Sequence, residues 1–357
     1  MKEKVVVGMS GGVDSSVAAY LLKEQGYDVI GVTMQIWQDK EFLEQNQEGG
    51  CCGLSAVDDA RRVADVLGIP YYVMNFKEDF QKHVIDYFVD EYLHARTPNP
   101  CIACNRYVKW ESLLQRALSI GADYIATGHY ARITKLSNGR FAIRNSVTAK
   151  KDQTYALYNL TQEQLARTLM PIGEFEKERV REIAREASLP VAQKRDSQDI
   201  CFVPDHDYAS FIKRETKEEM PEGNFVDEDG NVLGRHRGLV HYTIGQRKGL
   251  GITAETPLFV KELCREKNEV VLCRSESLFS STCIVSDMNY MAEASIKEGT
   301  PAIGKVRYSH QGAPCKLYPL SDGRLECRFE EPQRAMTPGQ AAVFYRDDYV
   351  LCGGTIQ

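Results

Sequence analysis

Apolar and polar positions follow two different periods along the first 145 residues. Lys4–Met9 contains the β-branched run Val5-Val6-Val7, which predicts a buried strand. A glycine-bearing turn follows, and Asp14–Gln25 has a helical spacing that ends at Gly26. Similar segments predict further strands at Asp28–Ile36, Tyr71–Phe76 and Asp123–Thr127. Three more helices are predicted at 55–68, Glu78–His94 and Asn105–Ile120. The helix at 55–68 is expected to be capped by Ser55. This alternation predicts an α/β fold, a parallel sheet with flanking helices.

The pattern changes in the second half of the chain. Residues 160–188 predict two helical segments separated by Pro171 and Gly173. Beyond about residue 220, short apolar runs are separated by turn signals such as Asp229-Gly230, a spacing typical of small all-β modules. We therefore predict an α/β domain followed by one or two small β domains, with a boundary near residues 275–285.

Composition narrows the class of protein. Of the 357 residues, 26% are charged and 43% are hydrophobic, which is typical of a globular protein rather than a disordered or fibrous one. No stretch approaches the roughly 20 apolar residues of a membrane helix, and Val5–Val7 is too short a run for a signal peptide. The 11 cysteines are odd in number. We therefore expect a cytoplasmic protein, without a membrane partner, whose thiols are reduced.

Charge is unevenly distributed along this acidic chain, whose net charge is −6. Residues 96–151 contain 10 basic and 2 acidic side chains, a balance of +8. A second basic run comprises Arg235, Arg237, Arg247 and Lys248. Such blocks are typical of a surface that binds a phosphate-rich partner, although the same charges could instead be dispersed over solvated faces.

The stretch Ser10-Gly11-Gly12-Val13-Asp14-Ser15-Ser16 lies between the first predicted strand and the first predicted helix. Its glycines allow backbone amides to close on an anion, and the helix N-terminus adds donors and a favourable dipole. Asp14 is a candidate Mg²⁺ ligand. Ser-Gly-Gly-x-Asp-Ser after a first strand resembles the pyrophosphate loop (PP-loop) of the N-type ATP pyrophosphatases. That resemblance implies cleavage of ATP to AMP and pyrophosphate.

Three cysteines are candidates for sulfur chemistry. Cys101 and Cys104 form a Cys-x-x-Cys directly before a predicted helix, whose dipole favours a thiolate, as do the nearby basic side chains. Cys201, in the segment 196–202, offers a third thiol. The sequence leaves open whether Cys201 lies near Cys104.

Motifs along the whole chain together resemble the bacterial tRNA-specific 2-thiouridylase (MnmA) family, a class of tRNA-uridine 2-sulfurtransferases. They are Gly8–Ser15, Met34, Ala126–Tyr130, Lys151–Gln153, Cys201, Tyr242–Lys248, Arg307-Tyr308 and Thr337–Gln340. The resemblance implies ATP-dependent adenylation of the C2 oxygen of the wobble uridine, followed by sulfur transfer from a cysteine persulfide. The products are 2-thiouridine, AMP and pyrophosphate. The target base must leave its stack to reach such a site.

The resemblance also assigns roles to individual residues. Cys201 would carry the persulfide, and Cys104 would be the second catalytic thiol, which releases the sulfur or forms a disulfide with Cys201. The expected ATP-binding residues are Gly8, Met9, Ser10, Gly11, Gly12, Val13, Asp14 and Ser15 for the phosphates and Met34 and Gly128 for the adenosine. The expected tRNA contacts are Asn99, Pro100 and Cys101 beside the target base, with His129, Lys151, Asp152, Gln153, Arg307, Tyr308 and Gln340 elsewhere.

The family resemblance also implies a domain organisation and partners. An α/β catalytic domain at 1–205 would be followed by a small central β-rich domain at 206–280 and a C-terminal β-barrel-like domain at 281–357. The expected tRNAs are those for Lys, Glu and Gln, bound partly by the C-terminal domain. The sulfur donor would be a cysteine desulfurase or a sulfur-relay protein. Mg²⁺ would accompany ATP, and a monomer is expected.

Alternatives remain at the level of sequence. Many family members carry Asp where this chain has Cys101. With Cys101 present, Cys101, Cys104 and Cys201 could instead ligate a [4Fe–4S] cluster.

Two other functions are also compatible with parts of the sequence. A different PP-loop ATP pyrophosphatase acting on a small molecule would explain the loop but not the thiols or the basic block. A non-enzymatic zinc-bearing RNA-binding module using Cys51, Cys52, Cys101 and Cys104 would leave the loop unexplained. The adjacent pair Cys51-Cys52 otherwise predicts a loop without a catalytic role.

Overall fold

The computed structural model describes residues 2–36, 54–194, 196, 200–203, 205, 207–217 and 220–357. Trp37, Cys51 and Cys52 lie outside these residues, so the interpretation of the Cys51-Cys52 pair stays a prediction. The chain forms two compact units. The first comprises Met1–Ile85, Cys101–Pro204 and Asp347–Val350, and the second comprises Asp86–Pro100, Asp205–Arg346 and Leu351–Gln357.

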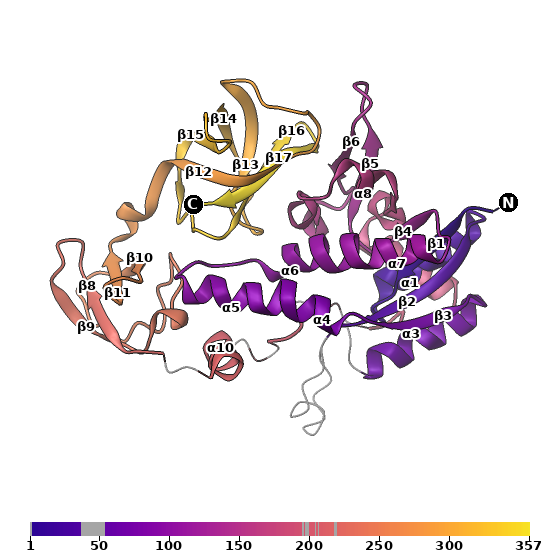
Figure 1. The fold of residues 1–357 in the computed structure, drawn as a ribbon, viewed down its shortest axis with the longest axis horizontal. Helices are drawn as coiled ribbons and strands as arrows, with labels where there is room; N and C mark the ends of the chain where they lie inside the picture. Colours follow the sequence, from indigo (N-terminus) through magenta and orange to yellow (C-terminus); the bar gives the residue numbers. More distant parts are fainter. Residues whose placement is uncertain are drawn as a thin grey trace. The chain divides into compact units, whose positions relative to one another are not determined.

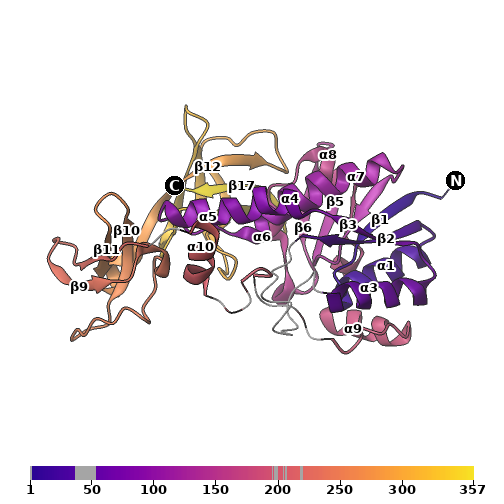
Figure 2. The same ribbon diagram turned by 60° about the horizontal axis from the view of Figure 1, so that its bottom comes forward.

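The first unit is built on a five-stranded parallel sheet of order β3-β2-β1-β4-β7. Its strands are β1 (Lys4–Gly8), β2 (Asp28–Gln35), β3 (Tyr71–Asn75), β4 (Tyr124–Ala126) and β7 (Thr168–Leu169). Its helices are α1 (Val13–Glu24), α3 (Leu54–Leu67), α4 (Lys77–Phe80), α7 (Leu114–Ser119), α8 (Gln162–Ala166) and α9 (Lys177–Glu186). Figure 2 shows α1, α3 and α9 along one face of the sheet and α7 on the other. The α/β prediction is confirmed.

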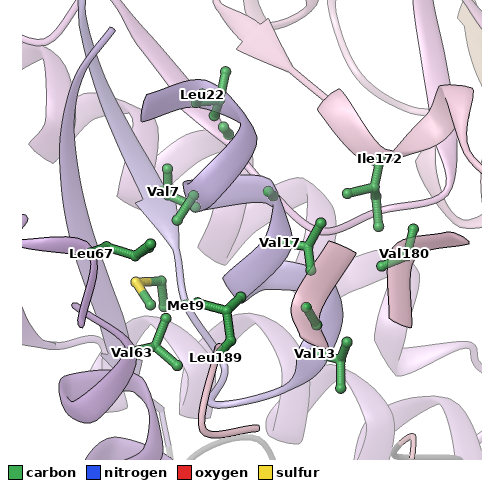
Figure 3. Close-up of a cluster of buried hydrophobic side chains, with 14 of the residues drawn as sticks. Val7, Met9, Val13, Val17, Leu22, Val63, Leu67, Ile172, Val180 and Leu189 are labelled. Atoms are coloured by element: carbon green, nitrogen blue, oxygen red, sulfur yellow. The ribbon is translucent and has the colours of Figure 1, made fainter. Parts of the chain in front are cut away.

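The core of this unit lies between the sheet and α1. Val5, Val6 and Val7 are fully buried, as expected of a central parallel strand covered on both faces. Val17 and Leu22 of α1 pack on this strand together with residues of α3 and α9 (Figure 3). Burial of these aliphatic side chains, at about 25 cal/mol per Å² of apolar surface, holds the start of α1 against the end of β1.

Several elements differ from their predicted bounds. α3 begins at Leu54, so that Ser55 lies inside the helix and not at its cap. The predicted helix Glu78–His94 consists of α4, the π-helix η1 (Gln81–Ile85) and α5 (Asp86–Leu93). A hairpin of β5 (Ala131–Lys135) and β6 (Phe141–Asn145), closed by a turn at Gly139, was not predicted. The remaining short 3₁₀ segments are η3 (Ala149–Lys151), η4 (Thr154–Leu157) and η5 (Pro171–Glu174).

The second unit contains α5, α10 (Tyr208–Thr216) and two β assemblies. The small sheet has the order β10-β11-β8-β9, formed by β8 (Gly223–Val226), β9 (Val232–His236), β10 (Phe259–Cys264) and β11 (Glu269–Cys273). The larger assembly, of order β12-β15-β14-β13-β16-β17, closes through pairing of β12 with β17 (Figure 1). Its strands are β12 (Phe279–Tyr290), β13 (Thr300–Lys305), β14 (Ala313–Pro319), β15 (Leu325–Arg334), β16 (Ala341–Arg346) and β17 (Tyr349–Ile356), with short helices η6 (Leu239–His241) and η7 (Ser275–Leu278) before them. The predicted C-terminal β-barrel is confirmed.

None of the helices in the described ranges is long and apolar enough to cross a membrane.

The C-terminus of α5 generates a stability prediction. Ala95 has a left-handed φ of 56°, and the hydrogen bonds Arg96 N–H to Glu91 O and Ala95 N–H to Tyr92 O are those of a Schellman motif. Because glycine has no Cβ penalty in this conformation, we expect Ala95→Gly to raise the free energy of unfolding by about 1 kcal/mol. Urea titration measures the change. Ala184→Gly, inside α9, is the matched control and should destabilise the protein; a lower midpoint for Ala95→Gly would contradict the assignment.

Candidate active site

The PP-loop joins the carboxyl end of β1 to the start of α1. Gly12 occupies the N-cap of α1, and among the described residues no side chain caps it, so the first amides of the helix remain available to an anion. The loop is closed by its own serines. Ser16 Oγ donates to Gly12 O at 2.7 Å, and Ser10 N–H donates to Ser15 Oγ at 3.2 Å. The loop is therefore shaped before any phosphate binds.

Gly11 and Gly128 lie so close to neighbouring backbone that a side chain at either position would clash. Gly11 has a φ of 67°, and a Cβ there would lie 2.3 Å from the carbonyl oxygen of Ala56 in α3. A Cβ on Gly128 would lie 2.5 Å from the backbone nitrogen of Ser15. The segment after β4 consequently rests directly on the beginning of α1.

The expected ATP residues gather at one edge of the sheet. The strand order changes direction at β1, because β2 and β3 extend from one side of it and β4 and β7 from the other. Ligands of open α/β sheets bind at the carboxyl ends of the strands beside such a reversal. The PP-loop follows β1, half-buried Met34 lies near the end of β2, and Gly128 follows β4. Residues from three distant parts of the sequence thus lie at or near the carboxyl ends of three adjacent strands.

A buried lysine lies beside the loop, and sequence reasoning missed it. Lys177, the first residue of α9, is 7% exposed. Its Nζ lies 2.7 Å from Asp14 Oδ1, 2.9 Å from Asp14 Oδ2 and 2.8 Å from Asp196 Oδ1. The hydroxyl of Tyr130 also donates to Asp14 Oδ1, at 2.8 Å. The carboxylate proposed as a Mg²⁺ ligand is therefore occupied by a protein cation, which brings a positive charge to the phosphate loop.

Asp196 is the second anion of this network. It accepts Lys151 Nζ at 2.9 Å and Arg181 Nη2 at 2.8 Å in addition to Lys177. Burial alone would raise the pKa of Asp196, but the hydrogen bonds from Lys177 and Lys151 outweigh burial and lower the pKa to about 2. Burial raises the pKa of the Tyr130 phenol far above 10, with the nearby Asp14 carboxylate second, so Tyr130 stays a hydrogen-bond donor. A lysine in the first turn of a helix, where the dipole favours acidic residues, was the one sequence signal of this network.

The cysteine segment differs from its prediction in one respect. The helix begins at Pro100, in α6 (Pro100–Ala103), and continues as the π-helix η2 (Cys104–Leu113). Cys101 and Cys104 therefore lie inside the helix and not before it, because proline is well suited to the first helical position. Cys101 is exposed, whereas Cys104 and Cys201 are half-buried.

The described residues contain no group of three or more His, Cys, Asp and Glu side chains arranged to hold a metal ion. Cys101, Cys104 and Cys201 all belong to the described residues, and the [4Fe–4S] alternative stays a prediction. Among the described residues, Asp14 is not part of such a group for Mg²⁺.

Most of the expected tRNA contacts after β4 already have protein partners. His129 is buried, its Nδ1 lies 2.7 Å from Thr127 Oγ1, and its ring packs on Trp110. Burial, with the charge of Lys109 second, holds the pKa of His129 well below its usual value, so the ring is neutral. Asp152 accepts the backbone N–H of Ser146, and Gln153 accepts that of Tyr130. Asp152 and Gln153 therefore shape the loop that follows the β5–β6 hairpin.

The basic segments are only partly available to an anionic partner. In the 96–151 block, at least five side chains form ion pairs with acids that lie outside the block: Arg96 with Glu91, Arg116 with Asp79, Arg132 and Arg144 with Asp348, and Lys151 with Asp196. In the second unit, the smaller basic run of Arg235, Arg237, Arg247 and Lys248 is exposed. Tyr308 of the barrel is 51% exposed, while Arg307 donates to the carbonyl of Arg334.

A parallel sheet whose first strand leads through a serine- and glycine-rich loop into an uncapped helix defines an ATP-binding α/β domain of the PP-loop class. Three family descriptions match consecutive parts of the chain: "tRNA methyl transferase HUP domain" at 3–205, "tRNA methyl transferase PRC-barrel domain" at 209–274 and "Aminomethyltransferase beta-barrel domain" at 280–356. The chain belongs to the family of the tRNA-specific 2-thiouridylases, MnmA.

Curated relatives match over their full length. The chain is 64% identical over 354 residues to the tRNA-specific 2-thiouridylase MnmA of Lachnoclostridium phytofermentans, covering 99% of each chain. It is 58% identical over 358 residues to MnmA 1 of Clostridium botulinum, covering 100% of both. It is 56% identical over 357 residues to MnmA of Clostridium perfringens, covering 100% of this chain and 99% of the relative.

Gly128 provides a test of the nucleotide site. In Gly128→Ala the new Cβ would lie 2.5 Å from Ser15 N, and backbone must move to relieve the contact. We expect ATP affinity, measured by equilibrium binding, to fall by about tenfold or more, equivalent to roughly 1.4 kcal/mol. The control Gly68→Ala places alanine at a φ of 62° with no atom within 4 Å, so it should lower stability but leave ATP affinity unchanged. Equal affinities for Gly128→Ala and the wild type would remove this segment from the site.

Asp196 generates a pH-dependent prediction. A carboxylate whose pKa falls from 3.8 to about 2 on folding stabilises the protein above pH 4, and this stabilisation is lost as the pH falls toward 2. We expect Asp196→Asn to have a lower urea midpoint than the wild type at pH 6, and the gap to close between about pH 4 and pH 2. Asp65→Asn, on the exposed face of α3, should track the wild type throughout. A gap that is constant with pH would contradict the network.

Proposed function

We propose that this protein thiolates the wobble uridine of tRNA. ATP adenylates the C2 oxygen of the base, and a cysteine persulfide then supplies sulfur, which yields 2-thiouridine, AMP and pyrophosphate. The observation that carries the proposal is the 64% identity to a tRNA-specific 2-thiouridylase over 99% of both chains. The PP-loop supports the first half of the reaction, and the half-buried thiols support the second half.

In the adenylation step, the C2 oxygen attacks the α-phosphate of ATP and pyrophosphate leaves. The uncapped amides of α1 bind the phosphates, and Ser10 and Ser15 hold the loop around them. Lys177 adds a fixed positive charge that offsets the charge developing on the departing pyrophosphate. Met34 and Gly128 border the adenosine. Mg²⁺ bound to ATP would supply further neutralisation of the phosphate charge.

In the sulfur step, the terminal sulfur of a Cys201 persulfide attacks C2, and AMP leaves with the electron pair of the C2–O bond. The base is then joined to Cys201 through a disulfide. Attack of the Cys104 thiolate on the Cys201 sulfur forms a Cys104–Cys201 disulfide and releases the thiolated base, after which a thiol reductant restores both cysteines. In the alternative order, Cys104 first releases hydrosulfide from the persulfide, and the hydrosulfide attacks C2. Either order divides a difficult exchange into easier covalent steps.

The proposal extends to partners and organisation. The substrates are the tRNAs for Lys, Glu and Gln, and the sulfur donor is a cysteine desulfurase or a relay protein. The protein acts as a monomer in the cytoplasm. Residues 1–205 perform the catalysis, 206–280 form the small central domain, and 281–357 contact tRNA. The exposed Arg235, Arg237, Arg247 and Lys248 provide phosphate contacts, which supply affinity without reading sequence.

Nucleoside mass spectrometry tests this proposal directly. Unmodified tRNA-Glu is incubated with the protein, ATP, Mg²⁺, cysteine and a cysteine desulfurase. We expect 2-thiouridine at the wobble position with the wild type and with Cys264→Ser, a change at another half-buried cysteine in β10. Cys201→Ser should reduce the product at least about a hundredfold, because the persulfide carrier is lost. AMP formation without RNA and without thiolated product would instead favour a small-molecule substrate.

A further inference from the structure

A turn at Thr337–Gln340, between β15 and β16, binds the segment that leads to the catalytic cysteines. The backbone N–H of Thr97 donates to the carbonyl of Pro338 at 2.9 Å. The side-chain amide of Gln340 donates from Nε2 to the carbonyl of Thr97 at 2.9 Å and to that of Pro98 at 3.4 Å. Donors and acceptors from the two segments therefore alternate along a short stretch of backbone.

The turn itself is held firmly by the barrel. Gly339 N–H donates to Ile356 O, and Ile356 N–H donates to Gln340 O, both at 2.9 Å, which attaches the turn to the end of β17. Gly339 has a φ of 88°, and a Cβ there would lie 3.0 Å from Arg96 Cβ, from Glu91 Oε2 and from Thr97 N. The contact is thus a close one between backbones, which leaves little room for the 96–98 segment to move.

The other side of the segment is fixed by an ion pair. Arg96 donates from Nε to Glu91 Oε2 at 2.9 Å and from Nη2 to Glu91 Oε1, and Glu91 is 8% exposed. Hydrogen bonding to Glu91 raises the pKa of the Arg96 guanidinium. Arg96 is held in this way against the end of α5, so Thr97 and Pro98 are constrained from both directions. Two residues later, Pro100 begins α6, which contains Cys101 and leads to Cys104.

We propose that Gln340 is a positioning residue, which fixes the start of the Asn99–Cys104 segment through the carbonyls of Thr97 and Pro98. This inference rests on the proposed thiolation and deepens it, because it gives Gln340 a role in turnover rather than in tRNA affinity. The amide donor of Gln340 is engaged with backbone, and its loss releases the segment on which the target base and Cys104 depend. A displacement of about 1 Å in such a segment is enough to slow a reaction by orders of magnitude.

The test separates turnover from binding. Gln340→Glu keeps the size of the side chain but replaces its donor with a carboxylate, which the two carbonyls repel. We expect kcat for 2-thiouridine formation to fall by about tenfold or more, while KM and Kd for tRNA remain within about twofold of the wild type. Gln340→Lys keeps a donor of similar reach and should recover part of kcat. The matched control Gln333→Glu, in β15, should retain wild-type kcat.

Hydrogen–deuterium exchange gives a second measurement that does not depend on activity. Amides of residues 95–104 should exchange faster in Gln340→Glu than in the wild type, and those of β1 and α1 should not change. An unchanged kcat with weaker tRNA binding would overturn the proposal in favour of a direct tRNA contact, and unchanged exchange at 95–104 would overturn it as well. Absence of 2-thiouridine with the wild type would instead contradict the proposed function, and the exchange comparison would still decide the role of Gln340.

Discussion

The ion pair between Lys177 and Asp14 is the contact around which the proposed nucleotide site is organised. An ammonium group this deeply buried is costly to desolvate, and only close carboxylates can offset that cost. Asp14 and Asp196 supply them, and both carboxylates accept further donors, Tyr130 in one case and Lys151 with Arg181 in the other. The network consequently ties α9 and Asp196 to the first turn of α1. Loss of one member would leave an uncompensated buried charge beside the phosphate loop.

The same network explains why the loop needs few side chains of its own. In the proposed site, the backbone N–H groups at the start of α1 point toward the anion. Ser15 and Ser16 hold the loop in shape through hydrogen bonds within it. Gly128 allows the segment after β4 to rest on this helix start. Positive charge then comes from Lys177, more than 160 residues away in sequence, and not from a lysine in the loop as in a Walker motif.

The charge of a sequence segment in this chain differs from the charge that the folded surface presents, because many cations pair with acids elsewhere in the chain. The +8 block at 96–151 predicts a strongly basic surface, yet at least half of its ten cations are paired with acids, several of them distant in sequence. Asp348 alone accepts both Arg132 and Arg144, and it helps to hold the β5–β6 hairpin. The smaller run of Arg235, Arg237, Arg247 and Lys248 is exposed, and within it Arg235 pairs with Glu222 on the surface. Partly buried pairs such as those of Arg132 and Arg144 serve local structure first.

Local sequence patterns determined a large part of this protein. The strand–helix alternation and the turn-rich second half predicted an α/β fold followed by β-rich structure, because periodicity and turn chemistry act over a few residues. The resemblance of the Ser-Gly-Gly-x-Asp-Ser loop to a PP-loop indicated the proposed ATP site, and the family resemblance implied the C-terminal barrel. Helix bounds were less predictable: Pro100 starts α6 before Cys101, and Ala95 takes a conformation that favours glycine. Only the tertiary structure decided that Lys177 pairs with Asp14, that Asp196 joins them, and that Gln340 holds Thr97 and Pro98. Those contacts join residues from 19 (Lys177 and Asp196) to 243 (Gln340 and Thr97) positions apart, and no local pattern encodes which distant partner a buried charge or a side-chain amide will meet.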